Sequence, residues 1–272
     1  MRFFALSFIS IIFSSTLALA RVAPPTVSLK IEEIFAISKG FDANDHVEIA
    51  VRGTLQDSCQ KVGTSSADVD LENGTISVRV EGYRRDSGAC LQMITPYLEI
   101  VPVGHLPAGN YQVLDLSGHA AAKSLSVNPS DHPGPDDYLY APVDRAMLSA
   151  PSAIRHSFES SMTDSSSQTL VLEGAYPRFL KGCMRVQEVR AYYSGNIMVV
   201  QPIARLFGNQ PDDPDSVPEC REGADQYNRF RISKEVKLPV LRQGLLHVRT
   251  PNGKSLNRLV DFWTPSASLS RM

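Results

Sequence analysis

The chain has 272 residues, of which 43% are hydrophobic and 21% charged, and its formal net charge at pH 7 is -2. This balance, without a long run of either sign, argues against nucleic acid or an anionic membrane surface as the partner. No segment after the N-terminus approaches the length of a membrane-spanning helix.

The first twenty residues are typical of a secretory signal peptide. Arg2 precedes an apolar run that is shorter than the ~20 residues a bilayer span needs. Ala18 and Ala20 then form a small-residue cleavage pattern. We therefore expect residues 1–20 to be a signal peptide and the mature protein to be exported, to the periplasm or the extracellular medium.

Short alternating apolar stretches follow in chain order, which is typical of half-buried strands. In the first half they are TVSLKIEEIFAI (26–37), VEIAVRG (47–53), TISVRVEGY (75–83) and YLEIVPVGHLPAGNYQVLDLSG (97–118). The last stretch contains two apolar runs around Pro107–Asn110. It predicts a hairpin with a longer loop.

The second half repeats this order. Its stretches are TLVLEGAYP (169–177), NIMVVQPIARLF (196–207) and KEVKLPVLRQGLLHVRTPNG (234–253). In both closing segments a second glycine lies nine residues after the first, from Gly109 to Gly118 and from Gly244 to Gly253. The shared spacing indicates a duplicated module.

The four cysteines fall into the same two frames, Cys59 and Cys90 in the first half, then Cys183 and Cys220 in the second. In an exported protein they indicate two disulfides. Three pairings are open. Pairing within each half is favoured because each module then closes its own loop.

These features predict an all-β chain of two tandem antiparallel β-sandwich domains, each with one intradomain disulfide. The arrangement resembles the architecture of immunoglobulin-like domains. The single Trp263 lies after the second cysteine frame, not between two cysteines. The cysteines are therefore not expected to form the usual bridge between the two sheets.

We place the first domain at 21–127 and the second at 169–264, with a flexible C-terminus at 265–272. Residues 128–168 are rich in Pro, Ser, Asp and Gly and predict a partly extended linker. The alternative is that YLYAPV and SAIRHSFE dock onto one module. Only VDRAMLSA within this linker suggests a turn or two of helix.

No catalytic constellation is evident, so we expect no enzyme activity and no cofactor. A G-x-S-x-G elbow is missing, and the six histidines are scattered singly without zinc-ligand spacing. The calcium candidates are Asp42, Asn44 and Asp45, with further acids at Asp136–Asp137 and 212–215. Because Asp and Asn also form turns, the turn interpretation is favoured and no metal is predicted.

Exposed aromatic residues could stack on a glycan. The candidates are Tyr83, Tyr97, Tyr111, Tyr176, Tyr192 and Tyr193. Tyr192 and Tyr193 are adjacent on a strand, so they should point to opposite faces, and one of them should be exposed. Aromatic residues are also favoured within strands, and that interpretation is preferred.

Two hypotheses remain. The leading one is a non-enzymatic secreted or periplasmic protein whose sandwiches bind a protein or other envelope macromolecule through loops or sheet edges, with a glycan the weaker candidate. The alternative is an exported hydrolase, or an accessory domain of one, with a site between the modules that uses His247 and nearby acids. The sequence leaves the oligomeric state open.

Overall fold

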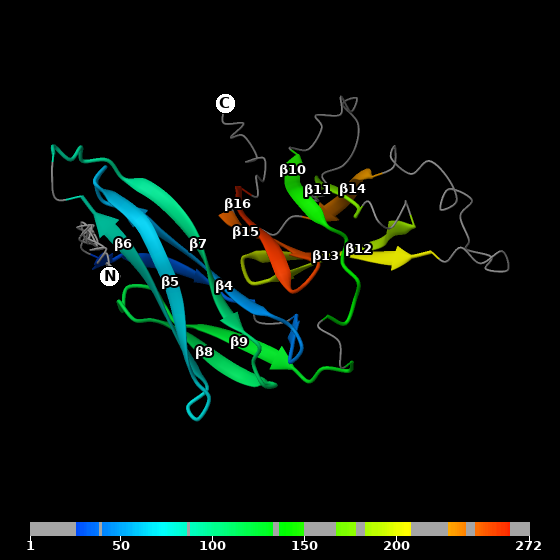
Figure 1. Cartoon of the computed structure of the whole chain (residues 1–272), viewed down its shortest axis with the longest axis horizontal. Coiled ribbons are helices and arrows are strands. Elements are labelled where there is room, and N and C mark those ends of the chain that lie inside the picture. Colours follow the sequence, from blue (N-terminus) through cyan, green and yellow to red (C-terminus); the bar gives the residue numbers. More distant parts are fainter. Residues whose placement is uncertain are drawn as a thin grey trace, which may run out of the picture.

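The structure is a computed structural model that describes residues 26–37, 40–85, 88–132, 136–149, 167–177, 183–207, 228–237 and 243–261. Within these ranges every regular element is a β-strand, and the strands form four sheets (Figure 1). The all-β class predicted from the sequence is therefore confirmed. The predicted signal peptide at 1–20 and the predicted C-terminus at 265–272 lie outside the described residues.

The described residues contain no helix that is long and apolar enough to cross a membrane.

The first half of the chain builds two sheets. One has the order β2-β4-β7, and the other has the order β1-β6-β8-β9-β3, with β5 also paired to β6. Their strands are β1 (Thr26–Ser28), β2 (Ile31–Phe35), β3 (Phe41–Asp42), β4 (Val47–Leu55), β5 (Gln60–Asp70), β6 (Thr75–Arg84), β7 (Thr95–Gly104), β8 (Gly109–Asp115) and β9 (Lys123–Asn128). The pairs β6–β8 and β3–β9 are parallel, and the others are antiparallel.

Alternating apolar residues from both sheets fill the space between them. Ile49 and Val51 of β4 and Ile76, Val78 and Val80 of β6 are all 0% exposed and belong to one core cluster. Alternate side chains of a strand point to opposite faces, so these positions face inward. The first half is therefore two sheets packed over one core.

The second half builds two further sheets, β10-β11-β14 and β12-β13-β15-β16. The strands are β10 (Val143–Ser149), β11 (Ser167–Ala175), β12 (Met184–Ser194), β13 (Ile197–Leu206), β14 (Arg229–Lys237), β15 (Gln243–Thr250) and β16 (Lys254–Asp261). Each described strand of the second half has a counterpart in the first: β10-β11-β14 corresponds to β2-β4-β7, and β12-β13-β15-β16 to β5-β6-β8-β9. Even the parallel pair recurs, as β6–β8 and β13–β15.

The hairpin predicted within 97–118 is wrong. β7 pairs with β4, whereas β8 pairs with β6 and β9, so the connection crosses from one sheet to the other. β14 and β15 are separated in the same way. Two apolar runs around a polar turn suit a hairpin and a sheet-to-sheet crossing equally, which is why the pattern misled.

Part of the predicted linker belongs to the second half. Residues 143–149, where a short helix was suggested, form β10, which pairs with β11 from Val143↔Gly174 to Ser149↔Thr169. The preceding residues also dock, because Tyr140 and Ala141 are 3% and 0% exposed. This pairing overrides the helix propensity of Ala, Met and Leu. The remainder of the linker, 150–166, lies outside the described residues.

One sheet of the second half is buried on both faces. In β13, Met198 and Val200 pack into the core of the second half, while Ile197 and Val199 join the core cluster of the first half. Leu245 of β15 joins the first-half cluster as well. The two halves therefore share an apolar contact across this sheet.

Candidate binding site

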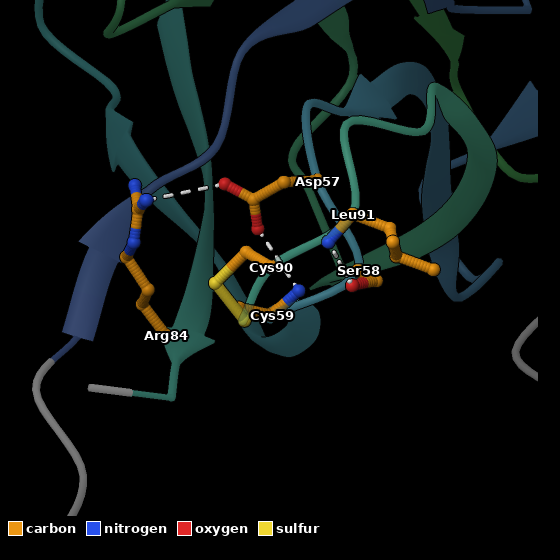
Figure 2. Close-up of a disulfide and its surroundings, with 6 residues drawn as sticks. All are labelled: Asp57, Ser58, Cys59, Arg84, Cys90 and Leu91. Carbon is orange, nitrogen blue, oxygen red and sulfur yellow. Dashed lines mark hydrogen bonds and ion pairs between the residues drawn. A yellow bond between two sulfur atoms is a disulfide. The ribbon is translucent and has the colours of Figure 1, made fainter. Parts of the chain in front are cut away.

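The disulfide between Cys59 and Cys90 anchors the candidate site (Figure 2). Its Cα atoms are 5.4 Å apart, and the cysteines are separated by 31 positions. Cys59 ends the connection between β4 and β5, and Cys90 lies shortly before β7. The first predicted pairing is therefore confirmed. The second involves Cys220, which lies outside the described residues, so the pairing of Cys183 with Cys220 stays a prediction.

Polar contacts hold the chain in place around this disulfide (Figure 2). The carboxylate of Asp57 accepts a hydrogen bond from the Cys59 amide at 2.9 Å and pairs with the Arg84 guanidinium at 3.2 Å. Ser58 and Leu91 exchange two hydrogen bonds, one from the Ser58 amide to the Leu91 carbonyl at 3.0 Å and one from the Leu91 amide to the Ser58 hydroxyl at 2.9 Å. The backbone at Leu91 is thus fixed by a covalent bond and by two hydrogen bonds.

The residues that follow this anchor are apolar and face water. Leu91, Met93 and Ile94 are 69%, 51% and 70% exposed. Leu91 and Ile94 are the two most exposed large hydrophobic side chains of the described residues. We call residues 91–94 the apolar loop. Three such side chains gathered on one restrained segment are typical of an interaction surface, whereas single exposed apolar residues are common on any protein.

The sequence analysis did not single out the apolar loop. Its signal was available, because LQMI directly follows Cys90 and precedes Pro96 without the alternation of a half-buried strand. The disulfide restrains the backbone of such an apolar run. Without alternation, the sequence does not indicate which of its side chains face the core. Only the structure shows that these side chains point away from the core.

The calcium candidates lie where the two halves meet. Asp45 is 3% exposed and forms an ion pair with Arg249 of β15, which is equally buried. Its second oxygen accepts a hydrogen bond from the Asp42 amide at 2.9 Å. The Arg249 guanidinium also lies over the ring of Phe41, 5.0 Å from its centre. The carboxylate of Asp45 is therefore already neutralised by a protein cation.

The other two candidates contact the segment that leads into the second half. The Asn44 amide donates hydrogen bonds to Asp137 Oδ1 at 3.0 Å and to the carbonyl of His132 at 3.1 Å. Burial, together with a hydrogen bond and charge repulsion from Asp137, raises the pKa of Asp42 to about 7. The same hydrogen bond lowers the pKa of Asp137. This carboxyl pair therefore shares a proton near neutral pH.

The described acids among these candidates do not form a group of three converging carboxylates. Among the described residues, the only group of three whose ligand atoms converge is Asp57 with Cys59 and Cys90, and both sulfurs belong to the disulfide. The turn interpretation of Asp42, Asn44 and Asp45 stays a prediction, and the acids at 212–215 lie outside the described residues.

His247, which the hydrolase hypothesis needs, is 2% exposed within β15. Its Nδ1 lies 2.7 Å from Oδ1 of Asn257, an amide and not a carboxylate. Burial lowers the pKa of His247 to about 3. A histidine this deep in a sheet cannot reach a substrate in a cleft between the modules.

The tyrosines proposed as glycan platforms pack within the protein. Tyr97, Tyr111 and Tyr176 are buried. Tyr192 packs against the first-half core and Tyr193 against the second-half core, so they point to opposite faces as predicted. The expectation that one of these two would be exposed is wrong, because the halves cover both faces of the sheet and leave each residue half-buried.

The outer face of sheet β10-β11-β14 carries a second feature, a groove of about 420 Å³. Arg145, Glu173 and Arg231 form one row across its three strands. Glu173 pairs with both arginines, at 3.5 and 3.1 Å. The charges largely compensate one another, so this row resembles an exposed ion-pair network more than a binding site.

The fold defines the class of the first half as a β-sandwich domain. The sequence model of one family, the ORF11 beta-sandwich domain, matches residues 49–114, about a quarter of the chain. The match runs from within β4 to within β8 and includes the disulfide and the apolar loop. No curated protein and no solved structure matches the chain.

Proposed function

We propose that this chain is an exported, non-enzymatic binding protein made of two related, immunoglobulin-like β-sandwich domains, and that it binds a protein partner in the cell envelope through the apolar loop. The observation that carries the proposal is the exposure of Leu91, Met93 and Ile94 on backbone that the disulfide holds in place. A fixed, water-facing apolar segment is poorly explained by folding alone.

The energetics favour binding at this loop. Burying one large apolar side chain stabilises a complex by roughly 1.5 to 3 kcal/mol. Much of that gain is lost when a flexible loop must be ordered on binding. The Cys59–Cys90 bridge and the two hydrogen bonds between Ser58 and Leu91 restrict the free loop beforehand. The loop can therefore present its side chains with little further ordering.

A protein partner fits this surface better than a glycan. Leu91, Met93 and Ile94 carry aliphatic or thioether groups, and the fourth loop residue, Gln92, carries an amide, so the loop offers no aromatic face on which a sugar ring could stack. The six candidate tyrosines named from the sequence are buried or half-buried. Apolar anchors surrounded by charged groups such as Asp57 and Arg84 are typical of protein interfaces.

Export is supported by the signal-peptide pattern of residues 1–20 together with the disulfide, since such bridges persist in oxidising compartments. The two-domain assignment is supported by the strand plan that both halves share. On that plan, the pairing of Cys183 with Cys220 would give the second domain a bridge like the first.

The proposal is tested by removing the apolar side chains. In the triple variant Leu91→Ser, Met93→Ser and Ile94→Ser, we expect partners captured from the native envelope to bind at least about a hundredfold more weakly, which corresponds to roughly 2.7 kcal/mol. The matched control is Leu71→Ser with Leu116→Ser, because these side chains are 59% and 55% exposed elsewhere on the first half. Equal capture by the triple variant and the control would contradict the proposal.

A further inference from the structure

A second groove lies between β10 and β16, each of which is the end strand of its sheet. Its volume is about 390 Å³, and it is lined by Met147, Leu148, Arg258, Leu259 and Val260. The four apolar residues are half-buried, and Arg258 is exposed. The Arg258 guanidinium bridges the two strands through a hydrogen bond to the carbonyl of Ala146. The groove therefore follows an edge of β16 with which no other described strand pairs, and its described lining is mostly apolar.

The first half shows what covers the corresponding edge. Gly109 pairs with Val127 in β8–β9, just as Gly244 pairs with Val260 in β15–β16. Val260 is thus the counterpart of Val127. On its other side, Val127 pairs in parallel with Phe41 of β3, a side chain only 1% exposed.

No described strand stands beside β16 in the place that β3 takes beside β9. β16 has β15 on one side, and its other side borders the groove. The position equivalent to that of Phe41 therefore falls in the groove, next to Val260. An edge that carries apolar residues and no proline is open to the addition of a strand.

We propose that this groove binds an extended segment of a partner protein, which adds to β16 as a parallel strand. The segment places a large apolar side chain beside Val260, where β3 places Phe41 beside Val127. Its backbone pairs with the edge of β16 that borders the groove, and its alternate side chains enter the groove.

Charge complementarity defines the segment further. Among the described residues of the lining, Arg258 alone is charged, and it lies two positions before Val260 on the same strand. In a parallel strand, the residue opposite Arg258 lies two positions before the large apolar residue that lies beside Val260. The preferred segment therefore has the order acid, any residue, large apolar residue. This site is separate from the apolar loop and does not depend on the function proposed for that loop.

The test uses a synthetic hexapeptide, Thr-Glu-Val-Phe-Val-Thr with blocked ends, titrated into the purified full chain. We expect binding that weakens at least tenfold when lysine replaces the glutamate of the peptide. In the Arg258→Glu variant the preference should reverse, so that the lysine peptide binds more tightly. Equal affinities of both peptides for both proteins would overturn the proposal, as would the absence of binding at about 1 mM peptide.

Further variants distinguish a loss of peptide binding from a loss of folding. Met147→Glu places a like charge in the groove and should also weaken the glutamate peptide at least tenfold, while circular dichroism stays unchanged. The triple serine variant of the apolar loop should bind the peptide as the wild type does, which separates this proposal from the other one. A photo-crosslinker at Leu148 that attaches to residues 150–166 of the same chain would show the groove to be filled internally and would overturn the proposal.

Discussion

Arg249 and Asp45 form an ion pair across the junction of the two halves, and only 4% of each side chain is exposed. Asp45 lies just before β4, and Arg249 lies in β15, so the contact joins segments that are far apart in the sequence. Asn196 adds a hydrogen bond to Glu33 at 2.7 Å across the same junction. Arg52 also donates a hydrogen bond to Gln243 at 3.2 Å, and the Ser255 hydroxyl donates one to Glu48. These polar contacts fix the orientation of the interface beside its apolar part.

Removing one partner of the buried ion pair should destabilise the protein strongly. Asp45→Ala leaves the Arg249 guanidinium buried without its counter-charge, which costs roughly 3 to 5 kcal/mol. Asp45→Leu combined with Arg249→Met removes both charges and should cost much less. Urea unfolding measures both. Equal losses in the single and the double variant would contradict this account.

An exposed ion pair provides the control. Arg190 and Glu188 lie 2.9 Å apart, and their side chains are 44% and 50% exposed. In urea unfolding, Glu188→Ala should leave the unfolding free energy nearly unchanged because solvent screens the pair.

The raised pKa of Asp42 predicts a loss of stability as the pH rises from about 4 to about 7. The pKa of Asp42 is raised to about 7, against an ordinary value of about 3.9 in an unfolded chain. Because the folded pKa is the higher one, the contribution is fully present below about pH 4 and is lost as the pH rises through about 7. Asp42→Asn stays neutral, so its unfolding free energy should fall less between pH 5 and about pH 8 than that of the wild type.

Asp70 is the matched control for this pH profile. Hydrogen bonds from Asn73 lower the pKa of Asp70, so its contribution is lost only as the pH falls into the acid range. Asp70→Asn should leave the profile between pH 5 and about pH 8 unchanged. If the unfolding free energy of both variants depended equally weakly on pH, Asp42 would not be the group that causes the pH dependence.

The Cys59–Cys90 bridge should contribute a large part of the stability of the first half. Its separation of 31 residues corresponds to roughly 3.5 to 4 kcal/mol in the chain-entropy estimate. Replacing both cysteines by serine should lower the unfolding free energy by about this amount and make the apolar loop more sensitive to protease. A loss below about 1 kcal/mol, with unchanged proteolysis, would argue against the anchoring role.

Peptide mapping without reduction tests the second predicted bridge. A peptide that links Cys183 to Cys220 should be recovered next to the one that links Cys59 to Cys90. Recovery of Cys220 as an unmodified thiol would contradict the expectation that each half carries its own disulfide.

The sequence predicted the parts of the fold that follow from local periodicity. The alternation of Val47, Ile49 and Val51 identified β4, and the repeated glycine spacing led to two halves with the same strand plan. The pairing of the strands could not be derived from the sequence. A connection that returns the chain within one sheet and a connection that crosses to the facing sheet both leave the same alternation of apolar and polar residues in the strands.

The junction between the halves was also beyond the sequence. The unbroken apolar run from Ile197 to Val200 is typical of a strand covered on both faces, but it does not say what covers the outer face. Asp45 is a residue type that is common in turns, and its sequence neighbours suggested a turn. Only the ion pair with Arg249, which is far away in the sequence, shows that Asp45 holds the two halves together. The exposure of the apolar loop likewise depends on tertiary packing and not on its composition.

The central claim is that the apolar loop contacts a protein partner. It is tested most directly by a photo-crosslinking residue at position 93, with the same residue at position 71 as the exposed control, in cells that export the chain naturally. We predict one discrete crosslinked protein from position 93 that is missing from position 71. The same crosslinking pattern from both positions, or no adduct from position 93, would contradict the account.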